Sequence, residues 1–137
     1  MTVESKSVVA QCPQEKLYDF LSDFNNIAPL APAGAIEQCT ADSCTVKVGG
    51  FIQLTITCLE RVPYSRIVVG PAANSSSPVP FRMEVGLQPE GVDATRVGIT
   101  VNIDGGNPMM TMMLKPKLKD AVDMMADKLQ YFASGIQ

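Results

Sequence analysis

The hydrophobic pattern of the chain changes once, and this change constrains the fold more than any other feature. Between residues 35 and 103, apolar and polar residues alternate, as they do in strands with one buried face. From residue 108 onward, apolar residues recur every three or four positions, as on one face of a helix. We therefore expect an antiparallel sheet whose apolar face is covered by one long C-terminal helix.

The alternating region divides into strands at its turn residues. Residues 35–40 and 44–48 form a predicted hairpin around Asp42-Ser43. The stretch 70–80 is rich in Pro and Ser and is the one long loop that the pattern indicates. The remaining strands are expected over residues 51–61, 66–69, 81–88 and 96–103.

The N-terminal part of the chain predicts one strand and two short helical pieces. Residues 2–10 alternate, with Val3 and Val9 on the same face of the expected strand. Pro13 suits the first position of a helix, and an apolar stripe follows it to about Asp23. Residues 27–30 have room for only one further short turn.

The C-terminal helix is expected to start at Asn107, a good N-cap, followed by Pro108 in the first turn. Pro116 lies inside the apolar pattern, where a proline removes one helical hydrogen bond. The spacing of apolar residues nevertheless resumes in phase beyond it. We expect one long helix that is kinked near Lys115.

Composition limits the classes of function. A chain of 137 residues corresponds to a single domain, residues 1–137, and 46% hydrophobic residues are enough for a sizeable core. The net charge of −3 gives no cationic face for phosphates, so no nucleic-acid partner is expected. The chain has no His, the commonest zinc ligand and neutral-pH acid–base group. No catalytic residues, metal site or cofactor are predicted.

No run of 18 apolar residues and no stretch of signal-peptide type is present, so we expect a cytoplasmic protein without stable membrane insertion. The four cysteines, Cys12, Cys39, Cys44 and Cys58, contain no C-x-x-C pair. Cys39 and Cys44 have the spacing to face one another across the predicted hairpin. In a reducing compartment we expect all four to be free thiols.

Two segments resemble a known family. Leu17-Tyr18-Asp19-Phe20-Leu21-Ser22-Asp23-Phe24-Asn25-Asn26 is similar to the first-helix segment of small bacterial START-like proteins, the SRPBCC superfamily. Asn107-Pro108-Met109-Met110, with Lys115-Pro116, is similar to the opening of their last helix. The resemblance covers essentially the whole chain and is closest to bacterial members labelled "polyketide cyclase/dehydrase and lipid transport".

The resemblance implies an α+β helix-grip fold, in which a curved antiparallel sheet of seven strands wraps around the C-terminal helix. It places two short helices between the first and second strands. It also implies a deep apolar cavity between the sheet and the last helix, which such proteins use for lipids, sterols or polyketides.

The last helix contains six of the eight methionines, and these flexible side chains suit a surface that repacks around apolar ligands. Together with the inward positions of the strands, they give the expected lining of the cavity. The predicted ligand-binding residues are Leu54, Ile56, Cys58, Met83, Val85, Ile99, Val101, Met110, Met113, Leu114, Leu118, Val122 and Met125.

Three functions fit these observations. The leading hypothesis is binding or transport of a hydrophobic small molecule, such as a lipid or polyketide. The first alternative is a cyclase/dehydrase-like enzyme that uses polar cavity residues such as Tyr18, Ser5 or Ser7, and it requires ionisable side chains that converge in the cavity. The second is a protein-interaction module, which predicts a small or filled cavity and an exposed apolar patch. A homodimer is compatible with the sequence.

Overall fold

The computed structural model describes residues 2–26, 36–48, 52–71, 81–103, 108–133 and 135; at residues 36, 46–48, 52–54, 110, 111 and 114 it describes the backbone only. The helices are α1 (Gln14–Ser22), the 3-10 helix η1 (Phe24–Asn26) and α2 (Pro108–Ala133). The strands are β1 (Thr2–Glu4), β2 (Val8–Ala10), β3 (Ile36–Cys39), β4 (Ser43–Val48), β5 (Ile52–Val62), β6 (Arg66–Pro71), β7 (Phe81–Pro89) and β8 (Thr95–Ile103).

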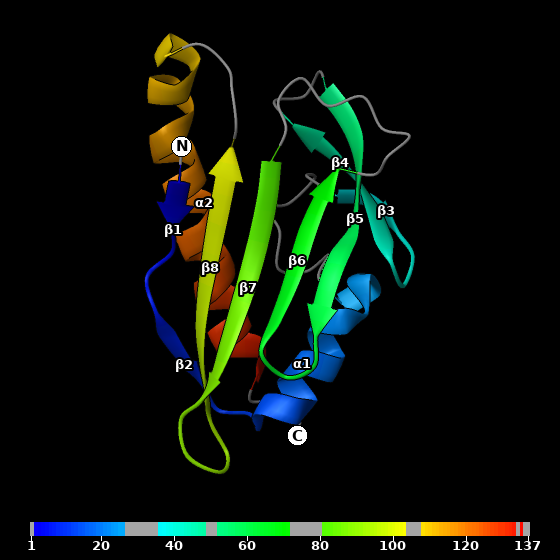
Figure 1. The fold of residues 1–137 in the computed structure, drawn as a ribbon, viewed down its shortest axis with the longest axis vertical. Helices are drawn as coiled ribbons and strands as arrows, with labels where there is room; N and C mark the ends of the chain where they lie inside the picture. Colours follow the sequence, from blue (N-terminus) through cyan, green and yellow to red (C-terminus); the bar gives the residue numbers. More distant parts are fainter. Residues whose placement is uncertain are drawn as a thin grey trace.

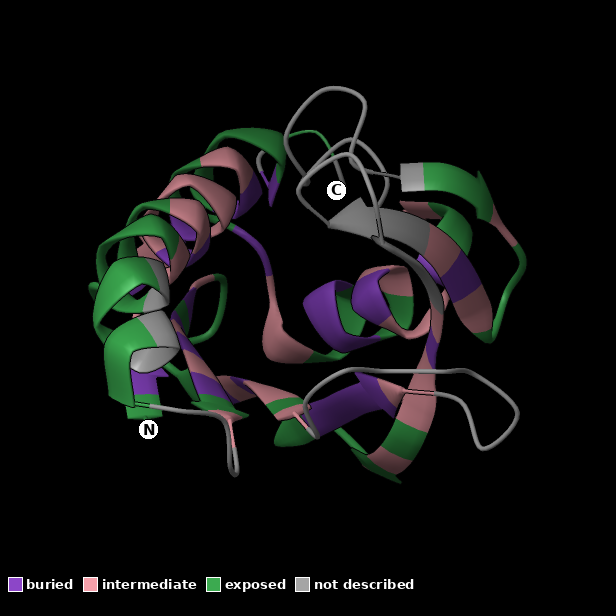
Figure 2. Cartoon of the chain, turned by 90° about the horizontal axis from the view of Figure 1, so that it is seen from above, coloured by how far each residue is buried: buried purple, intermediate pink, exposed green. Residues whose placement is uncertain are grey.

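All strands belong to one antiparallel sheet in the order β1-β8-β7-β6-β5-β4-β3, and β2 also pairs with β8 (Figure 1). The sheet curves around α1, and α2 lies beside its β1–β8 end (Figure 2). This arrangement confirms the predicted α+β class, the antiparallel sheet and the single long C-terminal helix, which runs through Pro116. None of the described helices has an apolar stretch long enough to cross a membrane.

The N-terminal strand differs from its prediction, because it is divided into β1 and β2. At the division, the backbone N–H of Ser5 donates to the Ile99 carbonyl at 2.7 Å, and the Ser5 hydroxyl accepts from the Ile99 N–H at 2.9 Å. The interruption shifts the alternation by one residue. Val8 and Ala10 are buried, not Val9, and the sheet therefore has eight strands where seven were expected.

The first helix is confirmed as α1, and η1 follows it directly. Its apolar stripe is buried, with Leu17, Leu21 and Phe24 all in the core. The second helical piece expected at residues 27–30 lies outside the described residues. Of the predicted loop at residues 70–80, the first two residues belong to β6, which ends at Pro71. Residues 72–80 lie outside the described residues.

Polar contacts attach α2 to the N-terminal strands, and we call this set the polar seam. The Lys6 N–H donates to Asp123 Oδ1 at 2.7 Å, and the Lys6 ammonium lies 2.7 Å from Asp127 Oδ1. Lys119 Nζ donates to the Glu4 carbonyl at 2.8 Å and lies 3.2 Å from Asp123 Oδ1. Further along the helix, Gln130 Nε2 donates to the Val9 carbonyl at 3.0 Å.

The polar seam lies along the part of the sheet that α2 covers, beside the buried Val122, Ala126 and Leu129 of the helix. α2 packs mainly on β1, β2 and β8, whereas α1 packs on β6 and β7. In Figure 1, α2 runs behind β8 and its first turns extend beyond the end of β8. The apolar face of the sheet is therefore shared between two helices at different ends.

Two of the four cysteines are not free thiols, contrary to the prediction. Cys39 and Cys44 are directly opposite in the β3–β4 pair, with Cα atoms 4.1 Å apart, and they form a disulfide. Cys12 and Cys58 are free. The prediction of four free thiols is wrong for this pair, because the hairpin register brings the two sulfur atoms within bonding distance.

Thiol titration checks the disulfide. Denatured protein that has never been reduced should give two thiols per chain, Cys12 and Cys58, and four after treatment with a reductant. Protein purified under non-reducing conditions that already gives four thiols would contradict the Cys39–Cys44 bond.

The polar seam predicts an acid-dependent stability. The hydrogen bond from the Lys6 N–H, followed by that from Lys119, lowers the pKa of Asp123. An unfolded Asp has a pKa of about 4. The Asp123 charge therefore stabilises the fold above that pH, and this stabilisation is lost as the pH falls through the lower folded-state pKa.

Asp123→Asn should lower the melting temperature at pH 7, and the difference from the parent protein should close in acid. Asp120→Asn is the matched control, because Asp120 lies exposed on the same helix and its side chain makes no hydrogen bond within the described ranges. Equal melting curves for the parent and Asp123→Asn at neutral pH would show that the seam does not hold the helix.

Candidate ligand-binding site

The inner face of β7 is buried at one end only. Its inward side chains are Phe81, Met83, Val85 and Leu87, which alternate with the outward Arg82, Glu84 and Gln88. Val85 and Leu87 are buried, but Phe81 and Met83 are only half-buried. The apolar face thus becomes more accessible toward the start of β7.

The same gradient occurs on β8 and α2. Val97 is fully buried, whereas Ile103, which pairs with Phe81, is half-buried. On α2, Leu129 is 1% exposed, and Leu118 is half-buried. Leu118 lies next to Lys119, whose ammonium binds the Glu4 carbonyl, and Glu4 pairs with Thr100 near the end of β8. These half-buried apolar side chains therefore lie at the same end of the molecule.

Between the helices and the sheet lies an enclosed apolar cavity of about 30 Å³, which we call the inner cavity. α1, η1, β6, β7, β8 and α2 all contribute to its wall. Its lining consists of Leu21, Phe24, Ile67, Val69, Met83, Val85, Ile99, Met125 and Leu129. The volume is well below the roughly 300–1,000 Å³ of typical small-molecule sites. A ligand would have to widen it toward the half-buried end.

The structure brings together part of the predicted lining. Met83, Val85, Ile99 and Met125 line the inner cavity. Ile56, Val101 and Val122 are buried in the core, and Cys58 and Leu118 are half-buried against it. The side chains of Leu54, Met110 and Leu114 lie outside what the structure describes.

Among the predicted lining residues whose side chains the structure describes, Met113 is the one that is misplaced. Its side chain is 65% exposed, and Met109 and Met112 are also exposed. At about 100° per residue, Met113 lies roughly 180° around the helix from the buried Val122, so its side chain is on the side of α2 that is turned away from the buried face. The prediction that Met113 faces the sheet is wrong for this reason.

Five lining residues were missed: Leu21, Phe24, Ile67, Val69 and Leu129. Their signals are present in the sequence, as the apolar stripe of the first helix and the apolar run of β6. Leu21 and Phe24 were missed because the wall opposite the sheet was assigned to the last helix alone. In the structure, α1 and η1 form part of that wall.

The polar residues of the enzyme alternative lie elsewhere. Tyr18 is buried against the edge of the Tyr64 ring, with the centroids 5.5 Å apart. The Ser5 hydroxyl is bound at the β1–β8 edge, and the Ser7 hydroxyl accepts from Arg96 at 3.2 Å. Burial raises the pKa of the Cys12 thiol, which keeps it protonated at neutral pH. The described residues contain no cluster of three or more potential metal ligands.

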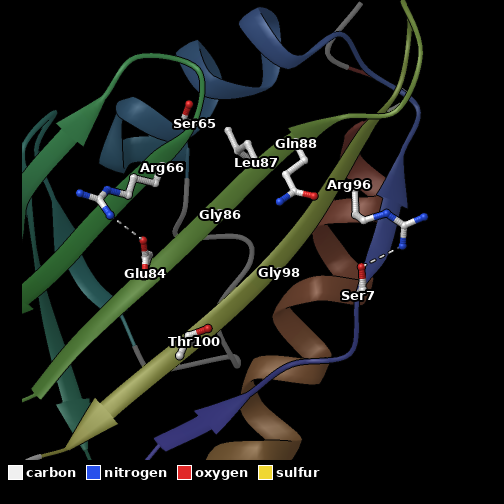
Figure 3. A pocket seen from close by; sticks show the side chains of 10 residues that line it. All are labelled: Ser7, Ser65, Arg66, Glu84, Gly86, Leu87, Gln88, Arg96, Gly98 and Thr100. Atoms are coloured by element: carbon white, nitrogen blue, oxygen red, sulfur yellow. Dashed lines mark hydrogen bonds and ion pairs between the residues drawn. The ribbon is translucent and has the colours of Figure 1, made fainter.

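A larger hollow of about 530 Å³ lies on the opposite, outer face of the sheet, around Gly86 and Gly98 (Figure 3). We call it the outer groove. Arg66 stands at one end and donates to Glu60 and Glu84 at 2.9 and 3.5 Å. Arg96 stands near the other end and binds Glu90 through two nitrogens at 3.0 and 3.1 Å. These hydrogen bonds lower the pKa of the Glu90 carboxyl. Sequence analysis did not single out this groove.

Comparison with known proteins identifies the fold. No family model and no curated protein matches the chain. A START superfamily protein from Mycobacterium smegmatis has a TM-score of 0.77 at 14% identity, covering 99% of both chains. Norcoclaurine synthase from Thalictrum flavum has a TM-score of 0.68 at 12% identity, covering 96% of this chain and 85% of that one.

A third solved structure is the di-domain ARO/CYC protein BexL from the BE-7585A biosynthetic pathway. It matches with a TM-score of 0.66 at 13% identity, covering 96% of this chain and 47% of BexL. At these identities the likeness concerns the fold alone. The chain has a START-like fold, as the resemblance of its helix segments implied.

The placement of α2 predicts contrasting effects of two truncations. Leu129→Ala should cost about 2–5 kcal/mol, because it enlarges a cavity in the buried core. Met113→Ala should change stability by no more than about 0.5 kcal/mol, as is usual for an exposed side chain. Urea denaturation measures both, and a larger loss for Met113→Ala than for Leu129→Ala would contradict the assigned faces of α2.

Proposed function

We propose that the protein binds a hydrophobic small molecule between the inner face of the sheet and α2. One observation carries the proposal: Phe81, Met83, Ile103 and Leu118 lie on the apolar inner side of the fold and are only half-buried. Apolar surface in contact with water costs roughly 25 cal/mol per Å² relative to buried surface. A bound apolar ligand would cover these side chains and recover that free energy.

The side chains at the half-buried end are suited to making room. Met83 and Met125 line the inner cavity, and both are half-buried. Methionine is unbranched and adopts several conformations at low cost, so it can move aside without disturbing the strand or helix that carries it. A ligand would thus enlarge the 30 Å³ inner cavity toward the half-buried end by displacing these two side chains.

The chemistry of the lining favours a carrier or sensor over an enzyme. The nine residues that line the inner cavity are all apolar, and such a surface offers shape and hydrophobic contact but no proton donor or acceptor. The neighbours of the same fold include a norcoclaurine synthase and an ARO/CYC protein, which supports a small molecule as the occupant. Its class would be a lipid, a polyketide or a similarly apolar compound.

A second candidate is a protein-interaction module. It is favoured by the small size of the inner cavity together with the exposed side chains of Met109, Met112 and Met113 on the first turns of α2. An apolar surface of this kind would bind an apolar patch of a partner protein. Blocking the half-buried end separates the two functions.

A fluorescent fatty acid, cis-parinaric acid, tests the leading proposal. The parent protein should bind it saturably. Met83→Trp should weaken binding by about tenfold, the equivalent of burying one or two fewer methylene groups of the ligand. Met112→Trp is the control, because Met112 is exposed on the protruding part of α2, and it should leave the affinity unchanged.

Melting curves of both variants establish that they are folded. Absence of saturable binding to the parent protein would contradict the proposal. A loss of affinity in Met112→Trp but not in Met83→Trp would instead move the apolar site to the exposed methionines, in agreement with the second candidate.

A further inference from the structure

Two glycines face each other in the middle of the sheet, on its outer face. Gly86 of β7 pairs directly with Gly98 of β8. Their sequence neighbours Val85, Leu87 and Val97 point to the buried side, so both glycines belong to the outer face. They form the floor of the outer groove (Figure 3).

The fold itself does not need glycine at these positions. A Cβ atom built at Gly98 meets no other atom within 4 Å, and one at Gly86 meets only the Gly98 carbonyl at 3.8 Å. Neither glycine has a positive φ. The β7–β8 register runs without a bulge from Phe81↔Ile103 to Pro89↔Thr95. Glycine inside a strand lowers stability and often marks a place where another molecule approaches the backbone.

Both guanidiniums of the groove are paired with carboxylates. Arg66 pairs with Gly86 across β6 and β7, and it is bound to Glu60 and Glu84. Arg96 is held by Glu90. Each guanidinium is thus oriented by a carboxylate, and an additional anion would compete with that carboxylate. The groove therefore favours an uncharged group, and the planar guanidiniums can stack on a ring.

Three other polar side chains of the groove have donors and acceptors that are available to a ligand. Gln88 and Thr100 lie on opposite sides of the glycine floor, and Ser65 lies next to Arg66 (Figure 3). Within the described part of the chain, none of these three side chains makes a hydrogen bond. An amide and two hydroxyls thus border a flat floor of bare peptide groups.

We propose that the outer groove binds a free, uncharged planar ring of the nucleobase type, which lies flat on Gly86 and Gly98. The ring face would contact the peptide planes that the glycines leave bare, and polar groups at opposite ends of the ring would hydrogen-bond to Gln88 and to Thr100. The groove volume of about 530 Å³ is within the range of small-molecule sites. The site lies on the opposite face of the sheet from the proposed hydrophobic ligand, so the two proposals can fail independently.

Adenine is the probe, and the amide NMR signals of Gly86 and Gly98 are the readout. Titration of the parent protein should shift both signals saturably. Gly98→Val should fold with an equal or higher melting temperature, because the added side chain meets open space and valine favours strands. It should weaken adenine binding by more than about tenfold, because it covers the floor.

Two further variants complete the test. Arg82→Val adds the same side chain on the outer face of β7 but outside the groove, and it should bind adenine like the parent. Gln88→Ala leaves the backbone unchanged and should weaken binding by about three- to tenfold, the equivalent of one hydrogen bond.

Three results would overturn the proposal. The first is a parent protein whose Gly86 and Gly98 signals do not respond to adenine. The second is a destabilised Gly98→Val combined with full affinity in Gln88→Ala, which would mean that the fold itself needs the glycine. The third is a shift of the groove signals with protein concentration alone, which would identify a second copy of the chain as the occupant.

Discussion

Lys6 binds α2 through two different groups at once. Its backbone N–H donates to Asp123, and its ammonium pairs with Asp127 one helical turn further on. Lys119 and Gln130 extend the same contacts to the carbonyls of β1 and β2. Together with the buried Val122, Ala126 and Leu129, these bonds attach α2 to the N-terminal strands, and the helix packs on β1, β2 and β8. α1 packs instead against β6 and β7.

The position of α2 explains where the inner face of the sheet is left uncovered. Where α2 and α1 approach the strands together, the apolar face is closed around Leu87 and Leu129. Toward Phe81 and Leu118 the cover is incomplete, and the apolar surface becomes accessible. Alternation along β7 then separates the two chemistries. Inward residues form an apolar hollow, and outward residues form a polar groove around Gly86.

The sequence was sufficient to predict the sheet wherever its alternation is uninterrupted. β7 and β8 keep one register over their full length, so every second residue falls on the expected face. The N-terminal strand was predicted with the wrong face after Ser5, because a side-chain hydrogen bond to the backbone divides it and no residue pattern marks that bond. The Cys39–Cys44 pairing was visible as a spacing, but its bonded state depends on the hairpin register and on chemistry outside the pattern.

The candidate site was harder to predict than the fold. Helical periodicity shows which residues share a face, but it does not show how far the opposing sheet extends. Met113 was assigned to the buried face although it lies about 180° around the helix from Val122, and accordingly Val122 is buried and Met113 is exposed. The contribution of α1 to the cavity wall was missed for a related reason, because its apolar stripe is equally well explained by a filled core. Which helix lies over which strand depends on long-range contacts, both apolar ones such as those of the buried Val122 and Leu129 and polar ones such as that of Lys6.

The methionines themselves provide the most direct test of an apolar site at the half-buried end of the inner face. With methyl-labelled methionine, each methyl group gives a separate NMR signal that responds to a ligand nearby. On addition of lauric acid, the account predicts saturable shifts of Met83 and Met125, which line the inner cavity. The signals of the exposed Met109, Met112 and Met113 should stay unchanged. Shifts of these three without any change at Met83 and Met125 would contradict it.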